Sequence, residues 1–185
     1  MLQEKNKLRN KPAKRAAAAA VLALLVCAGV FNIVRAQKTY AAIGGSGTAN
    51  SPYIITTEAE LKEFAGYINA GTSPWRNSDK YYKLTADISL SGSWTPIGTS
   101  NWPFMGNFNG GGHKITGLNI NNGSNNQGLF GFINGGTVQN LGLESVNVKS
   151  KSKVGAVTAN LNGGTISHCY VTGSVSGESS VGGIA

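Results

Sequence analysis

The sequence predicts a mainly β protein in which short strands stack as the successive coils of a parallel β-helix, or solenoid. An apolar triplet recurs in the C-terminal half, beginning at Ile115, at Val138 and again at Ile166. Steps of roughly 20 to 30 residues indicate stacked supersecondary units rather than one globular core. The units are rich in β-branched residues and turn at Gly or Asn, which is typical of strands in a solenoid.

Two further repeats support this interpretation. Asn-Gly-Gly-Thr occurs at 134–137 and returns at 162–165, and Val154 and Val181 begin matching segments that are separated by a step of similar length. In such a stack each strand bonds to the coils above and below, and the inward side chains form apolar columns. We expect one of these columns to be lined by Leu118, Leu141 and Cys169.

An N-terminal cap is predicted ahead of the repeats. Thr57 and Glu60 have the spacing of a capping box, and apolar residues then follow at helical spacing as far as Gly71: Leu61, Phe64, Ala65 and Ile68. A helix with one apolar stripe must cover an apolar surface, and the open end of a β-stack is such a surface. We therefore expect a flexible entry at 42–51, a capping region with one short amphipathic helix at 52–114, and β-helix repeats at 115–185.

Residues 1–41 have the layout of a secretory signal peptide. The n-region, 1–15, holds six basic residues, and 16–34 is an uncharged apolar run. Small residues favour cleavage before Gln37 or before Ala42, and the sequence does not choose between the two. An uncleaved signal anchor over 16–34 and lipid attachment at Cys27 are the alternatives. We expect export, with this segment as the only part that meets the membrane.

The positive charge of the chain resides in the same segment. Residues 1–42 carry eight of the 16 Lys and Arg residues and one of the eight acidic residues, which leaves eight basic and seven acidic residues in the remainder. A near-neutral body lacks the basic surface that nucleic-acid binding requires, so no nucleic-acid partner is expected.

The exported part resembles the GLUG repeats of bacterial surface proteins over about residues 46–185. The segments that carry the resemblance are 128–131 (GLFG), 134–138 (NGGTV), and the leader-like 82–90 (YKLTADISL), 94–98 (WTPIG) and 104–113 (FMGNFNGGGH). One departure is 156–159 (AVTA), which takes the place of GLFG in the second unit.

This resemblance implies a right-handed β-helix on a large secreted or cell-surface protein, such as an adhesin or an IgA-cleaving metallopeptidase. The peptidase chemistry of the latter belongs to a separate domain, and this sequence contains no His-Glu-x-x-His. Ile184 and Ala185 fall midway through a predicted coil. We therefore expect either a truncated piece of a longer chain or a last coil that pairs along its edge with another molecule.

The acidic residues predict no catalytic site. Cleavage of a polysaccharide needs paired carboxylates, or carboxylates that hold a metal, on adjacent coils. Asp87 has no second acid in its strand, and it could meet Asp79 only through a fold that the sequence does not specify. The remaining exported acids are Glu58, Glu60, Glu63, Glu144 and Glu178.

No metal or cofactor site is predicted from the other reactive side chains. His113 and His168 are the only histidines, and a metal would need a third ligand. Cys169 matches the apolar positions of the triplet, so we expect it to be a buried small hydrophobe. Core packing is also the favoured role of four aromatic residues that could otherwise form a platform for sugar rings: Trp75, Trp94, Trp102 and Phe104.

The sequence thus predicts an exported, non-catalytic β-helix segment with a structural or adhesive role at the cell surface or in the medium. Its partner would be a host or matrix glycan or protein. The alternative is the substrate-binding portion of a polysaccharide-active enzyme, or of a surface metallopeptidase, whose catalytic domain lies elsewhere.

Overall fold

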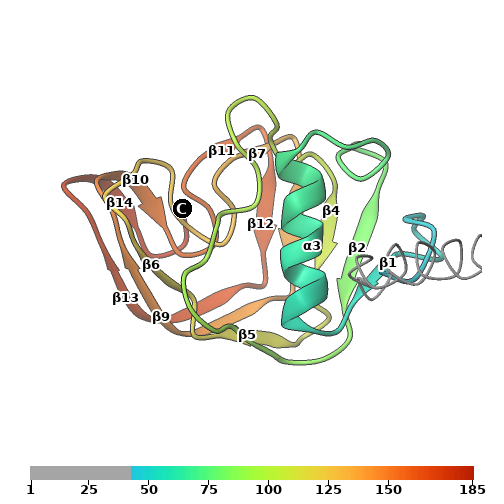
Figure 1. Ribbon diagram of the computed structural model, residues 1–185, viewed down its shortest axis with the longest axis horizontal. Coiled ribbons are helices and arrows are strands. Elements are labelled where there is room, and N and C mark those ends of the chain that lie inside the picture. Colours follow the sequence, from blue (N-terminus) through green and yellow to red (C-terminus); the bar gives the residue numbers. More distant parts are fainter. Residues whose placement is uncertain (1–42) are drawn as a thin grey trace, which may run out of the picture. The chain divides into compact units, whose positions relative to one another are not determined.

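Residues 43–185 form a parallel β-solenoid whose successive coils add strands to its longest sheets, as the computed structural model shows (Figure 1). The predicted signal segment lies outside these residues. The predicted fold class is confirmed: the described part is mainly β, with a single short helix in its N-terminal region. Within residues 43–185 no helix is long and apolar enough to cross a membrane.

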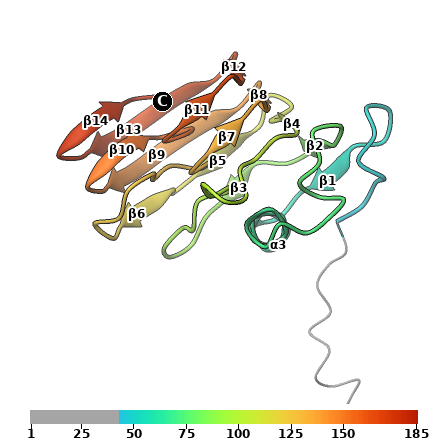
Figure 2. The same cartoon turned by 90° about the horizontal axis from the view of Figure 1, so that it is seen from above.

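Two five-strand groups of parallel strands form the longest walls of the solenoid. The first sheet consists of β1 (Tyr53–Ile55), β2 (Tyr81–Leu84), β4 (Asn107–Asn109), β8 (Thr137–Gln139) and β12 (Thr165–Ser167). The second sheet consists of β3 (Ile88–Ser89), β5 (Lys114–Thr116), β9 (Gly142–Lys149) and β13 (Tyr170–Ser176), with β6 (Asn119–Asn121) also paired to β9. Figure 2 shows the strands of the second sheet following one another along the stack.

Two shorter pairs complete the later coils: β7 (Ile133–Asn134) with β11 (Leu161–Asn162), and β10 (Ser152–Gly155) with β14 (Ser179–Gly182). The first sheet starts at Tyr53, so strands from the predicted capping region continue the same ladder as the predicted repeats. Residues 43–51 turn back on this ladder, where Ile54 N–H donates to the carbonyl of Gly44.

The core consists of the inward side chains of successive coils. Along the strands, buried and exposed residues alternate, as in β2, where Tyr82 and Leu84 point inward. Paired positions one coil apart carry apolar side chains that are almost fully buried, such as Ile115 and Leu143. Burial of each such side chain stabilises the fold by roughly 1.5–3 kcal/mol.

The register of the apolar triplets corrects one sequence-based expectation. Val138 pairs with Ile166 as predicted, but its partner in the preceding coil is Phe108, whereas Ile115 pairs with Leu143. The step from Val138 to Ile166 is therefore a true coil, and the step from Ile115 to Val138 is not. Each coil has several inward apolar positions of the same type, so a triplet from one sheet matches a triplet from the other.

The predicted column is divided in the same way. Leu141 and Cys169 immediately precede the paired residues Gly142 and Tyr170, so they occupy one column. Leu118 instead precedes Asn119, whose partner is Asn147, which places it beside Val146. Leu118 and Leu141 are both buried, but in different columns.

A left-handed backbone marks the corner between the first and second sheets. Gly112, Asn140 and His168 occupy this corner in successive coils and have φ values of 81°, 54° and 52°. The Asn140 N–H donates to Ser167, and Gly112 N–H donates to Asn140, which joins the corners of adjacent coils. Gly and Asn tolerate this conformation well, which explains why they punctuate the repeats.

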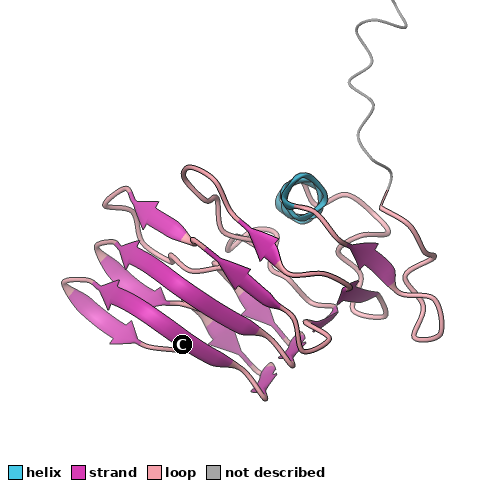
Figure 3. Cartoon of the chain, turned by 90° about the horizontal axis from the view of Figure 1, so that it is seen from below, coloured by secondary structure: helices cyan, strands magenta, loops and turns pink. Residues whose placement is uncertain are grey.

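The helix α3 (Glu58–Asn69) covers the N-terminal end of the core, as predicted (Figure 3). Both hydrogen bonds of the capping box between Thr57 and Glu60 are present, and the four predicted apolar residues of the helix are buried. The Phe64 ring lies 4.5 Å from that of Tyr82 and 5.9 Å from that of Phe108. Asn69 fixes the far end of the helix to the next coil, because its side chain bonds Pro96 and Gly98.

Candidate functional site

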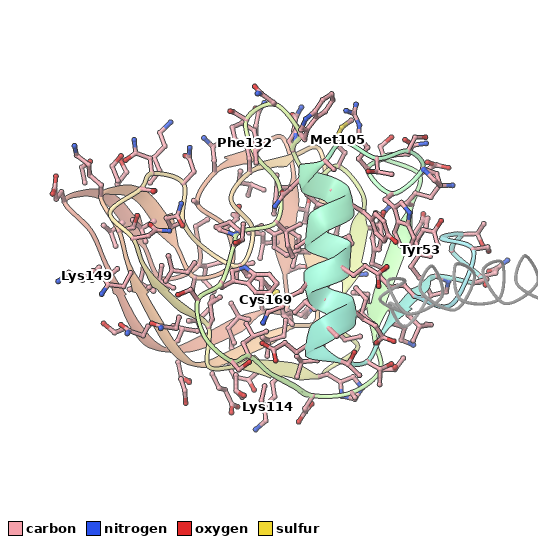
Figure 4. All side chains as sticks on the ribbon, viewed as in Figure 1. Tyr53, Met105, Lys114, Phe132, Lys149 and Cys169 are labelled. Carbon is pink, nitrogen blue, oxygen red and sulfur yellow. The ribbon has the colours of Figure 1, made fainter. Side chains whose placement is uncertain are left out.

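A polar network crosses four successive coils on the outer face of the second sheet. Asp87 Oδ1 accepts from the backbone N–H of Lys114 and lies 3.2 Å from Nδ1 of His113. Lys114 Nζ lies 2.9 Å from Oε2 of Glu144 in the next coil. The Tyr170 hydroxyl, one coil further, donates to Oε1 of Glu144 over 2.8 Å. Figure 4 shows the Lys114 side chain extending away from the ribbon.

The network holds both of its carboxyl groups in the ionised form. The hydrogen bond from Lys114, followed by that from Tyr170, lowers the pKa of Glu144. The Lys114 backbone N–H, followed by the His113 ring, lowers the pKa of Asp87. In turn, the bond to Glu144 raises the pKa of Lys114. A general acid needs a raised carboxyl pKa, so this arrangement is set for ion pairing between coils and not for proton donation.

Glu144 is the network residue that the sequence-based search did not connect to Asp87. The steps from Asp87 to Lys114 and from Lys114 to Glu144 are each close to the length of one coil. A search of the sequence for acidic and basic residues one coil length apart could have found these contacts. Asp79, the partner considered for Asp87, pairs with its neighbour Lys80 at 2.9 Å. Within residues 43–185 no hydrogen bond or ion pair joins Asp79 to Asp87.

The three acids on α3 have structural contacts. Glu58 accepts from Ser91 in the next coil and pairs with Lys62 at 2.6 Å. Glu60 closes the capping box, and Glu63 accepts from the Tyr67 hydroxyl over 2.6 Å. The contact of Glu58 with Ser91 fixes the cap to the stack, and the others stabilise the helix itself.

The two histidines lie in different surroundings. His113 belongs to the polar network, whereas His168 is a corner residue with positive φ. In the part of the chain that the structure describes, no three His, Cys, Asp or Glu side chains gather closely enough to hold a metal ion.

Cys169 faces the core of the last coil. Its side chain packs against the core cluster while remaining partly exposed, and its thiol donates to the carbonyl of Ser167 over 3.3 Å. Burial raises the pKa of this thiol, which disfavours the reactive thiolate.

The four aromatic residues do not form a common platform. Phe104 and Trp94 are buried, and the Trp94 indole donates to the carbonyl of Leu129. Trp75 is stacked between the rings of Tyr53 and Tyr67, at 4.1 Å and 4.5 Å. Trp102 is 41% exposed, with the Arg76 guanidinium 4.7 Å from its ring. Core packing therefore accounts for most of this set, as expected.

Comparison with known proteins gives two relatives and one structural neighbour. No family model matches the chain. It is 33% identical over 166 residues to a protein of Evansella cellulosilytica provisionally named a Gly-rich membrane protein; the match spans 83% of this chain and 18% of that protein. It is 35% identical over 155 residues to halomucin of Haloquadratum walsbyi, spanning 76% of this chain and 2% of halomucin. The chain thus spans less than a fifth of either relative.

The structural neighbour is a crystal structure from Bacteroides ovatus, provisionally assigned as an immunoglobulin A1 protease. The TM-score is 0.55 at 24% sequence identity, and the match covers 70% of this chain and 40% of that one. At this identity the likeness shows a shared fold and nothing about activity.

Proposed function

We propose that this chain is an exported structural and adhesive module of the bacterial cell surface, with no catalysis of its own. The observation that supports this most is the polar network of the second sheet, in which the ionisable side chains pair from coil to coil and keep both carboxyls ionised. A stack of this kind presents long polar faces to the surroundings. A relative named as a membrane protein fits a role at the cell envelope.

We also infer that the repeats are of the GLUG type, with a change in their alignment. Gln127 pairs with Val154, and Leu129 N–H donates to the carbonyl of Ala156, so Gly128 stacks on Gly155. Gly155 in turn pairs with Gly182. The first glycine of the motif therefore recurs in each later coil, while Phe130 pairs with Thr158, so the segment 156–159 still stacks on the rest of the motif.

Surface display requires the N-terminal signal segment to direct export. The full chain with a C-terminal epitope tag would be produced in a bacterial host, and intact cells treated with a protease that cannot enter them. We expect loss of the tag from intact cells, and protection of the tag when residues 1–41 are deleted. Protection of the complete chain in intact cells would contradict the proposal.

The alternative function is substrate binding for a catalytic domain that lies elsewhere. Both functions require that this chain cleaves no substrate itself, and an assay of turnover tests that requirement. The purified chain would be incubated with polysaccharides and with immunoglobulin A, and the products analysed by mass spectrometry. We expect intact substrates. Bond cleavage that is lost in Asp87→Ala or Glu144→Ala would contradict the non-catalytic proposal.

A further inference from the structure

A groove of about 310 Å³ lies on the outer face of the first sheet, beside the entry segment. Its volume falls at the lower end of the range for small-ligand sites, about 300–1,000 Å³. The polar side chains that line it come from the entry segment and from three adjacent coils: Asn50, Tyr81, Lys83, Asn107, Asn109 and Gln139. It is separate from the network on the second sheet.

The entry segment forms a fixed wall of this groove. Its backbone is bonded to β1 through Ile54 and Gly44, and to β2 through Tyr81 N–H, which donates to Gly47 over 3.0 Å. Gly47 has a φ of 72°, and a Cβ there would lie 2.3 Å from the Tyr53 ring. The close approach and the left-handed backbone both require glycine, which explains how this turn lies so flat against the stack.

The floor of the groove is a grid set by the strand register. Tyr81 pairs with Asn107, and one row further along the same face Lys83 pairs with Asn109, which pairs with Gln139. Paired residues on neighbouring strands lie about 4.8 Å apart. Five polar side chains thus project from three consecutive coils into one hollow.

Two of the amides are held in a fixed orientation. The Asn109 Oδ1 accepts from Gly111 N–H and from the Asn140 amide, over 2.8 Å and 3.0 Å, which directs its NH₂ group outward as a donor. Asn107 donates its NH₂ group to the carbonyls of Ser78 and Lys80, which leaves its oxygen as an acceptor.

The other three floor side chains are open to a ligand. Among residues 43–185, Gln139, Lys83 and the Tyr81 hydroxyl make no hydrogen bond, and Tyr81 is 37% exposed. No acidic side chain lines the groove. The site therefore offers donors, acceptors, one aromatic ring and one positive charge.

We propose that this groove binds the sugar residues of a glycan. Neighbouring hydroxyls of a sugar both donate and accept, which matches the amide grid, and the exposed Tyr81 ring can contact an apolar ring face. A peptide fits less well, because Ala49 and Pro52 are the only apolar residues of the exposed lining in the described part of the chain, and the outer edge of β1 is already bonded by Gly44. The inference rests on the proposed adhesive function and identifies its ligand-binding surface.

The positive charge of Lys83 distinguishes two classes of glycan that could occupy the groove. A uronate-containing glycan would place its carboxylate on Lys83, whereas a neutral glycan would use the amides and Tyr81 alone. Lys83→Gln removes the charge while keeping a hydrogen-bonding side chain. It should weaken uronate binding and its salt dependence, with little effect on a neutral oligosaccharide.

The test uses the purified full-length chain on an array of neutral and uronate-containing oligosaccharides, followed by calorimetric titration with the strongest binder. We expect Tyr81→Ala and Gln139→Ala each to raise Kd by about tenfold, which is the loss of one or two hydrogen bonds or contacts. Leu161→Ala is the control, since Leu161 is an exposed large side chain of β11, outside the first sheet and outside the polar network. It should leave Kd unchanged.

Three outcomes would overturn the inference: no binding to any arrayed glycan, binding that Tyr81→Ala and Gln139→Ala leave unaltered, or capture of array peptides instead. Circular dichroism of each variant would show that the solenoid remains folded. Because binding is measured on purified protein and export on intact cells, failure of one proposal is distinguishable from failure of the other.

Discussion

Gly128 contacts the carbonyl of Gly155 in the next coil so closely that a Cβ on Gly128 would lie 2.1 Å from that oxygen. A Cβ on Gly155 would itself lie 2.2 Å from the carbonyl of Thr158 in the same coil and 2.9 Å from that of Ile184 in the next coil. Neither glycine has a positive φ, so the requirement is one of space and not of backbone conformation. The recurrence of glycine at this corner in successive coils lets the backbone of one coil approach the next.

Substitution Gly128→Ala should therefore lower the free energy of unfolding by about 1–3 kcal/mol, the usual cost of overpacking. Gly66 in α3 is the control, because a Cβ there meets nothing within 4 Å. Gly66→Ala should instead stabilise the helix by about 0.5–1 kcal/mol. Urea unfolding of both variants measures the difference. An equal effect of the two substitutions would contradict the steric explanation.

The later coils could be predicted from the sequence because they have nearly constant length. The step from Val138 to its partner Ile166 is almost the same as the step from Val154 to its partner Val181. Earlier coils vary in length, as the unequal spacing of the paired positions along the first sheet shows: Tyr53, Tyr82, Phe108 and Val138. Ile115 is nevertheless as far from its partner Leu143 as Val138 is from Ile166, so the mismatch of Ile115 with Val138 arose because the triplets of the two sheets are alike, and not from coil length.

The polar network predicts a measurable dependence of stability on pH. Asp87 and Glu144 have lowered folded-state pKa values, so the stability they contribute is present above the unfolded carboxyl pKa, about 4, and is lost as the pH falls through the folded value. Lys114→Met should flatten the fall in melting temperature between pH 6 and pH 3. The side chains are 41% and 30% exposed at Lys114 and Glu144, so the change is expected to be small.

Lys149→Met serves as the control for this measurement. Lys149 is an exposed residue of β9 that makes no ion pair within residues 43–185, so its removal changes the net charge equally without breaking the network (Figure 4). Identical pH profiles for the two variants would show that the network contributes nothing to stability.

Substitutions of Cys169 test whether its side chain points into the core of the last coil. Cys169→Val keeps a small apolar side chain beside Leu141 and should be nearly neutral. Cys169→Asp places a charge against the core and should destabilise the coil by more than about 1 kcal/mol. Hydrogen exchange of the β12 and β13 amides measures this locally, with faster exchange expected only in the aspartate variant. Equal protection in both variants would place the side chain in solvent.

The groove and the polar network could not be predicted from the sequence for a common reason. Asp87 and Glu144, or Tyr81 and Gln139, are separated by about two coils along the chain and reach the same face only because the strands stack in register. The helix, by contrast, was predictable because Thr57, Glu60 and the apolar stripe are local signals. Local sequence patterns therefore predicted the helix and the strands, whereas the groove and the polar network depend on the register between strands of different coils.

The last prediction concerns the packing of α3 against the N-terminal end of the core. Phe64 is fully buried and contacts the rings of Tyr82, Phe104 and Phe108, so Phe64→Ala should cost about 3–5 kcal/mol of unfolding free energy. Phe132→Ala is the control, because Phe132 is only partly buried, and it should cost less. Loosening the helix also exposes the first coil, and exposed strands pair with other molecules. Light scattering should therefore detect more self-association for Phe64→Ala than for Phe132→Ala. If the two variants have equal stability and equal association, α3 does not protect the end of the stack.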